Sequence, residues 1–190
     1  MRGILPSFTA LVAALLSSTA HAAAISSTQD AVGSICWPLH FAGVTLDVTT
    51  DAQLRRLLGA GVFRQTEGDT GGRYFVDQKH SATLHVVMYT DSVVGEMTLL
   101  AGVDASLNKR EQEKARSKFF DPEEGFGKWH ALHLGSSKTE VLANLGTPAI
   151  RNNDNVWEYS ASCACEIPHH MRVYFSDGNL FKVVFSAPAG

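Results

Sequence analysis

Two cysteines and two histidines lie close together near the C-terminal end of the chain, as Cys163-Ala164-Cys165 and His169-His170. Thiolate and imidazole groups are ligands that suit zinc or copper(I), and four of them beside one predicted hairpin loop could converge on a metal ion. The spacing matches no standard zinc-binding pattern, however, and Pro168 can simply shape the loop. The simpler interpretation is a structural thiol pair beside an exposed histidine pair. A metal-binding or thiol-redox protein is the alternative hypothesis.

A third cysteine, Cys36, makes the number of cysteines odd, so one thiol stays free or pairs outside the chain. A disulfide between Cys36 and either Cys163 or Cys165 would close a loop of more than a hundred residues. Such a bond is worth about 4–5 kcal/mol in the chain-entropy model. A disulfide between Cys163 and Cys165 would be strained. We therefore expect a disulfide that includes Cys36.

The sequence carries no catalytic motif. It has no Gly-x-Ser-x-Gly elbow, no cysteine–histidine family signature and no glycine loop that could hold a phosphate. The adjacent carboxylates Glu123 and Glu124 lie on a predicted loop and point apart, whereas glycoside hydrolysis needs two carboxylates that face one bond. We therefore expect a protein that is not an enzyme and binds no cofactor.

The net charge of −3 argues against a protein that binds nucleic acid, because such proteins carry an excess of basic residues. Hydrophobic residues make up 45% of the chain and charged residues 18%, so we expect most of it to fold. The length of 190 residues allows one domain or two small ones.

Residues 1–22 have the features of a cleavable signal peptide. Arg2 supplies the positive charge, Ile4–Leu16 is the apolar stretch, and Ala20-His21-Ala22 is a small-x-small cleavage site. The apolar stretch of 13 residues is shorter than the ~20 needed to cross a bilayer, and no cysteine near the cleavage site could carry a lipid. We expect an exported, periplasmic protein that is neither a lipoprotein nor a transmembrane protein.

Two segments about 87 residues apart carry the same signals for a short helix. Each begins with a hydroxyl residue followed three positions later by Gln or Glu, which is the capping-box pattern. Each ends in a glycine that can close the helix in a left-handed conformation. An internal duplication is therefore predicted. The pairs that share this spacing are Thr50/Ser137, Gln53/Glu140, Leu54/Val141, Leu58/Leu145 and Gly59/Gly146.

The segments that follow the two helices have strand character and match in order: Arg73–Asp77 with Val156–Ser160, Leu84–Thr90 with Met171–Ser176, and Val93–Leu100 with Leu180–Phe185. Between them, Asp104–Lys118 is predicted to be an exposed connecting helix. We therefore expect an α+β fold of two tandem repeats, each with short helices packed on an antiparallel meander. The predicted parts are a signal peptide (1–22), an N-terminal segment (23–43), a first repeat (44–103), a connecting helix and linker (104–128) and a second repeat (129–190).

The last hairpin allows its register to be predicted. If Asp177-Gly178-Asn179 is a three-residue loop with Asn179 left-handed, the numbers of paired residues sum to 356 and one face is entirely apolar. The apolar face carries Met171, Val173, Phe175, Phe181, Val183 and Phe185. The other face carries Arg172, Tyr174, Ser176, Leu180, Lys182 and Val184.

The same register, carried back to the first repeat, places His85 on the core face, where we expect its hydrogen bonds to be satisfied. That core face also holds Val87, Tyr89, Met97 and Leu99. The opposite face is more apolar than a solvated sheet surface should be, so it must meet the other repeat or a partner. It carries Leu84, Val86, Met88, Glu96, Thr98 and Leu100.

The order of parts in the second repeat resembles the outer-membrane-assembly lipoproteins known as SmpA/OmlA or BamE-like, whose fold is shared with the tandem β-lactamase inhibitor proteins. The resemblance covers Ala131–Phe185 well and Val44–Leu100 more faintly. It implies helices on antiparallel sheets that form a concave, non-catalytic protein-binding surface. This chain lacks the lipidated cysteine and shows no match to an inhibitor's enzyme-binding loop. The matching residues are Leu134-Gly135-Ser136-Ser137-Lys138-Thr139-Glu140-Val141, Leu145-Gly146-Thr147-Pro148, Val156-Trp157-Glu158-Tyr159 and Val173-Tyr174-Phe175-Ser176-Asp177-Gly178.

We therefore expect an exported, non-enzymatic binding module of the bacterial cell envelope that recognises a protein or another envelope component through a sheet face. Aromatic and arginine side chains carry most of the binding energy on such surfaces. The residues predicted to contact the partner are Met88, Glu96, Arg172, Tyr174 and Lys182.

Overall fold

The computed structural model describes residues 40–65, 71–89, 92–118, 120–122, 132–161 and 169–187. The predicted signal peptide and the three cysteines lie outside these residues. In chain order the elements are β1 (His40–Phe41), β2 (Val44–Thr45), α1 (Asp51–Leu58), β3 (Val62–Gln65), β4 (Gly71–Val76), β5 (Ala82–Met88), β6 (Val94–Ala101), α2 (Lys109–Ala115), α3 (Lys138–Leu145), β7 (Ile150–Asn153), β8 (Val156–Ala161), β9 (His169–Ser176) and β10 (Asn179–Ser186).

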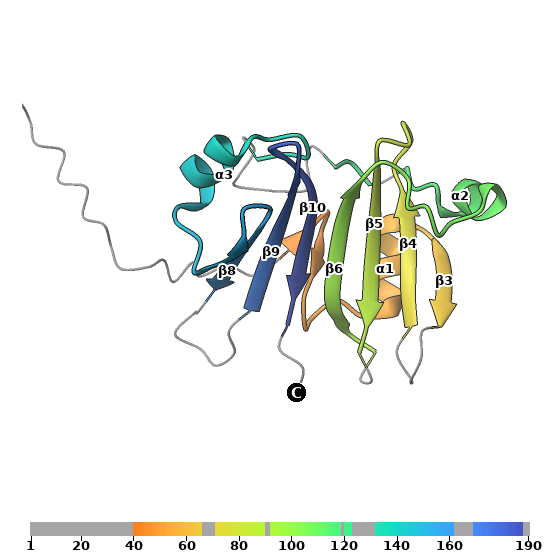
Figure 1. The fold of residues 1–190 in the computed structure, drawn as a ribbon. Coiled ribbons are helices and arrows are strands. Elements are labelled where there is room, and N and C mark those ends of the chain that lie inside the picture. The colour runs from red at the N-terminus through yellow and green to blue at the C-terminus, as the bar shows by residue number, and fades with distance from the viewer. Residues whose placement is uncertain are drawn as a thin grey trace, which may run out of the picture.

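Within the described residues the protein is an α+β structure with three helices and one eight-stranded antiparallel sheet (Figure 1). The strand order is β3-β4-β5-β6-β10-β9-β8-β7, so the first four and the last four strands run in mirrored order and meet at β6 and β10. β1 and β2 form a separate small hairpin. None of the described helices is long and apolar enough to cross a membrane.

The two short helices begin and end at the residues that the sequence predicts. Thr50 begins α1 and Ser137 begins α3, each with a complete capping box. Gly59 and Gly146 follow the two helices with φ of 93° and 76°, which glycine adopts without the strain that a Cβ would cause. The connecting helix is shorter than predicted, because Asn108 caps its start with extended backbone angles and only Lys109–Ala115 is helical.

One face of the sheet carries the hydrophobic core. α1 lies behind β4 and β5 in Figure 1 and buries Leu54 and Leu58 against this face, and α3 buries Val141 and Leu145. A single apolar cluster extends across strands of both halves of the chain. The two predicted repeats are therefore not evident as separate units, because their strands join into one sheet over one core.

The final hairpin confirms most of the predicted register and corrects its turn. Val183 pairs with Val173 and Phe185 with Met171, as predicted. The turn, however, is Asp177-Gly178, and both residues have positive φ (52° and 81°), as a two-residue hairpin turn of this kind requires. A bulge between Leu180 and Lys182 then restores the predicted pairing. Leu180 consequently lies in the core with 1% of its surface exposed, and Phe181 lies on the other face beside Tyr174.

The register predicted for the first hairpin is wrong by one residue on β5. Val86 pairs with Met97 and Leu84 with Leu99, and all four are buried in the core. The reason is a β-bulge between Val87 and Met88, where β6 contributes one residue more than β5 to the strand pairing. The register predicted from the final hairpin contained no such bulge. Met88 therefore faces the core instead of the opposite face.

Candidate functional site

The face of the sheet that lies away from the core is called the open face here. Because paired residues on neighbouring strands point to the same side, its residues form rows across the sheet. The central row is Val62, Tyr74, His85, Thr98, Val184, Arg172, Glu158 and Ile150. The row on one side is Val76, Thr83, Leu100, Lys182, Tyr174 and Val156, and the row on the other side is Gly72, Val87, Glu96, Ser186, His170 and Ser160.

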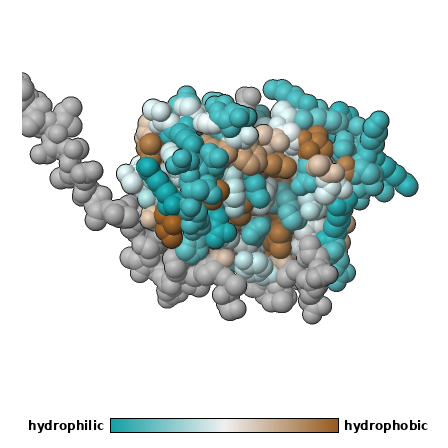
Figure 2. All heavy atoms as spheres, in the orientation of Figure 1, coloured by the Kyte–Doolittle hydropathy of each residue, from teal (hydrophilic) through white to brown (hydrophobic). Residues whose placement is uncertain are grey.

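α2 covers one end of the open face. Val76 packs against Leu107 and Ala115 in a small apolar cluster, and Arg64 on β3 forms an ion pair of 2.6 Å with Glu111 on α2. This pairing lowers the pKa of Glu111 and raises the pKa of Arg64. No described helix covers the remaining strands of this face, on which polar and apolar side chains are mixed (Figure 2).

One group of side chains on the open face is called the cationic–aromatic cluster. It consists of Arg172, Tyr174, Phe181 and Lys182, with Glu158 beside them. The Nε of Arg172 donates to Oε1 of Glu158 at 2.9 Å, and this hydrogen bond raises the pKa of Arg172. The Nζ of Lys182 lies 4.8 Å from the centre of the Tyr174 ring, a distance typical of a cation–π contact. The ring of Phe181 meets the Tyr174 ring edge to face at 6.4 Å. β9 and β10 thus place two cations and two aromatic rings side by side.

His85 lies on the open face and not on the core face, where it was predicted. Its ring stacks on the Tyr74 ring with centroids 4.1 Å apart and extends over Gly72, where a Cβ atom would lie 2.3 Å from Nε2. Nε2 is shielded from solvent and has no hydrogen-bond partner among the described residues, so the prediction of a satisfied histidine is also wrong. Burial lowers the pKa of His85, and the charge of Lys182 lowers it further, while Asp104 opposes both.

The structure brings three of the five predicted contact residues together. One cluster contains Arg172, Tyr174 and Lys182. Glu96 lies on the same face but outside this cluster, where it pairs with Ser186. Met88 is only 7% exposed and belongs to the core, so it is removed from the candidate surface. Sequence reasoning missed Phe181, because the bulge that turns it outward has no clear signal in the sequence.

The histidines proposed as metal ligands are not gathered into a metal site by the described residues. His169 binds Asp47 through Nε2 at 3.0 Å, which ties β9 to the segment before α1. His170 lies on the open face, opposite Ser160. No group of three or more histidine, cysteine, aspartate or glutamate side chains within the described ranges could hold a metal ion. Cys163 and Cys165 lie outside those ranges.

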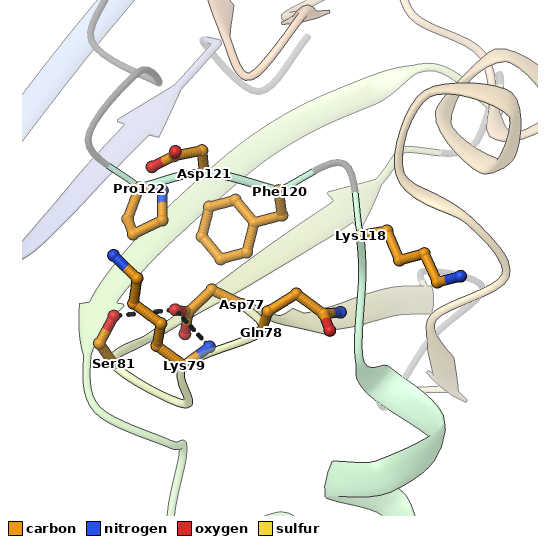
Figure 3. Close-up of a pocket in the computed structure, with 8 residues that line it drawn as sticks. All are labelled: Asp77, Gln78, Lys79, Ser81, Lys118, Phe120, Asp121 and Pro122. Carbon is orange, nitrogen blue, oxygen red and sulfur yellow. Dashed lines mark hydrogen bonds between the residues drawn. The ribbon is translucent and has the colours of Figure 1, made fainter.

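A small pocket of about 150 Å³ lies between the β4–β5 turn and the segment that contains Phe120 and Pro122 (Figure 3). The buried carboxylate of Asp77 lines it, but this group accepts from the backbone N–H groups of Lys79 and Ala82 and from the Ser81 hydroxyl. These bonds hold the turn together. In Figure 3 the Lys118 ammonium points away from the other side chains, so the pocket does not gather charged groups around one point.

Comparisons with known proteins give one structural similarity. No protein-family model matches the sequence, and no curated protein sequence matches it. The fold is similar to the crystal structure of a DUF4309 family protein, YjgB from Bacillus subtilis. The two chains are 13% identical, with a TM-score of 0.46 over 77% of this chain and 83% of that chain.

Proposed function

We propose that the protein is an exported, non-enzymatic binding module of the bacterial cell envelope that recognises a protein or another envelope component through its open face. The observation that carries this proposal is the partly exposed surface of β5, β6, β10 and β9, on which aromatic, aliphatic and charged side chains lie together. Such mixed surfaces with aromatic and arginine side chains are typical of protein interfaces.

The sequence adds support for the cellular setting. Residues 1–22 have the pattern of a cleavable signal peptide, which would deliver the protein to the periplasm. The second half of the chain resembles the BamE-like envelope proteins in the order of its helix, glycine and strand motifs. The two matching capping boxes and the mirrored strand order are what an internal duplication would leave, and we propose that the chain arose in this way.

The flanks of the cysteines support the expected disulfide. Phe41, five residues after Cys36, stacks near Phe185 on β10, with ring centroids 6.3 Å apart. Phe185 pairs with Met171, which lies six residues after Cys165. A segment of five or six residues can span up to about 20 Å. The described residues that follow Cys36 and Cys165, Phe41 and Met171, are therefore close enough for the two cysteines to meet. A disulfide from Cys36 to Cys163 or Cys165 would therefore fit this arrangement.

A bulky side chain at the middle of the open face tests the proposal. Thr98 lies between His85 and Val184 in the central row, and Thr98→Trp should block any occupant of this face without adding charge. The matched control is Ala143→Trp, which places the same side chain on the exposed surface of α3. Immobilised mature protein would be used to capture partners from an envelope extract, and the thermal stability of each variant would be measured.

The expected result is a partner captured by the wild type and by Ala143→Trp but lost from Thr98→Trp, with the three proteins equally stable. If a folded Thr98→Trp variant captures the same partner as the wild type, the open face is not the binding surface.

A further inference from the structure

The cationic–aromatic cluster has a geometry that selects among possible partners. Tyr174 pairs with Lys182, and Arg172 precedes Tyr174 by two positions on β9, so the three side chains project from the same face. Residues two apart on a strand are separated by about 7 Å. The two cations therefore flank the Tyr174 ring at a spacing that one extended segment could contact with neighbouring side chains.

The exposed charge of this cluster is positive. The side chain of Arg172 is 52% exposed, whereas that of its partner Glu158 is 15% exposed. Glu158 Oε1 also accepts a hydrogen bond of 2.6 Å from the Asn152 side chain, so two hydrogen bonds fix the position of this carboxylate. The guanidinium group of Arg172 remains the more exposed of the two charged groups. Lys182 has no carboxylate partner among the described residues.

Glu96, a second carboxylate on the open face, lies too far away to neutralise this charge. Glu96 pairs with Ser186, which lies four positions along β10 from Lys182. Four residues of a strand span about 13 Å, which exceeds the Debye length of about 8 Å at physiological ionic strength. An incoming anionic group would therefore meet the cations of this cluster with little competition from Glu96.

Apolar surface lies between and beside the two cations. The rings of Tyr174 and Phe181 contact each other, and the partly exposed Val156 is the cross-strand neighbour of Tyr174. A free inorganic anion would leave this apolar surface exposed to water. A peptide that carries both carboxylates and apolar side chains would bury it and also pair with the cations, and Arg172 can bind a carboxylate through two parallel hydrogen bonds.

We infer that the partner of the open face is a protein that presents an acidic segment, whose carboxylates bind Arg172 and Lys182 while an apolar side chain packs on Tyr174 and Phe181. This inference rests on the proposed function and names the partner's chemistry.

The test uses two short synthetic peptides that alternate phenylalanine with either glutamate or glutamine. Binding to the full mature protein would be measured by peptide fluorescence anisotropy at low and physiological salt. The glutamate peptide should bind at least about tenfold more tightly than the glutamine peptide, and its affinity should fall as salt screens the charges. The double variant Arg172→Gln/Lys182→Gln should lose this tenfold preference.

Two further variants separate local contact from overall charge. Lys79→Gln/Lys118→Gln removes the same charge from exposed lysines that line the pocket near the β4–β5 turn, and it should bind like the wild type. The exchanged variant Arg172→Lys/Lys182→Arg keeps both charges and should retain most of the preference for glutamate.

Equal binding of the two peptides overturns the inference, as does an equal loss of affinity in both double glutamine variants. Vesicles of phosphatidylglycerol and phosphatidylethanolamine provide another arm: binding to vesicles without binding to the glutamate peptide overturns it in favour of a lipid surface. If Thr98→Trp still abolishes capture from the envelope extract while the glutamate peptide shows no preference, the proposed function stands and only the partner's chemistry is wrong.

Discussion

His85 should make the stability of the protein depend on pH in a defined direction. Its Nε2 is shielded over Gly72 with no described partner, so a proton placed there would be buried without an acceptor. Burial accordingly lowers the pKa of His85 in the folded state, while the same histidine in the unfolded chain has a pKa of about 6.5. Between these two values the unfolded chain binds a proton that the folded protein does not bind. Stability therefore falls as the pH drops below about 6.5.

The magnitude follows from the linkage relation. One proton bound only by the unfolded state gives a slope of up to about 1.4 kcal/mol per pH unit. His85→Phe keeps a flat ring against Tyr74 but cannot titrate, so this part of the slope should disappear. Urea unfolding at pH 7.5, 6.5 and 5.5 measures the free energy of unfolding of both proteins. Between pH 6.5 and 5.5 the wild type should lose up to about 1 kcal/mol more than the variant.

The comparison of slopes removes the effect of the substitution on absolute stability. Carboxyl groups with lowered pKa values, such as Asp51 and Glu140, stabilise the fold above their unfolded pKa values, which lie near about 4. Their contribution is therefore almost constant between pH 5.5 and 7.5, is lost only at lower pH, and is the same in both proteins. If wild type and His85→Phe lose the same free energy between pH 7.5 and 5.5, the shielded histidine is not the cause and the reasoning fails.

Three further predictions concern stability and thiols. Gly61 has φ of 59° and a Cβ there would lie 2.7 Å from the Phe75 ring, so Gly61→Ala should cost roughly 2–4 kcal/mol in urea unfolding. Gly59 also has a positive φ, of 93°, but nothing lies within 4 Å of a Cβ there, so Gly59→Ala should cost only about 1–2 kcal/mol; equal losses would contradict the contact. Thr50→Ala and Ser137→Ala should each lower stability by about 1 kcal/mol, and an unchanged unfolding midpoint would argue against the capping boxes. Denatured but unreduced protein should show one free thiol, and three would exclude the expected disulfide.

Local signals in the sequence were sufficient to predict the helices. A capping box involves groups three residues apart, and the closing glycine needs only its own backbone freedom, so α1 and α3 could be located without tertiary information. The apolar alternation of the last hairpin predicted correctly that Val173 and Val183 face the core and that Lys182 faces away from it. In each case the decisive interaction lies within one element or between adjacent strands.

The remaining errors arise where a single residue changes the pairing of a strand. A slip of one residue moves every side chain of a strand to the opposite face, and a bulge produces such a slip with no change in composition. The shift near Met88 exchanged the faces of β5, and the bulge near Phe181 brought a second aromatic ring to the candidate site. The sequence also did not predict that the halves would share a sheet, because β6 and β10 pair across a long stretch of chain.

The position of β10 in the middle of the sheet affects how the molecule can assemble. β10 is the final strand in the chain order, yet it hydrogen-bonds to β6 on one side and β9 on the other. Until it docks, β6 has an unpaired edge, and such an edge can recruit strands from other molecules. Removal of β10 would therefore separate the four strands β3–β6 from the three strands β7–β9 and leave both groups with an unpaired edge that is prone to aggregation. The eight-stranded sheet can form only after β10 has been synthesised.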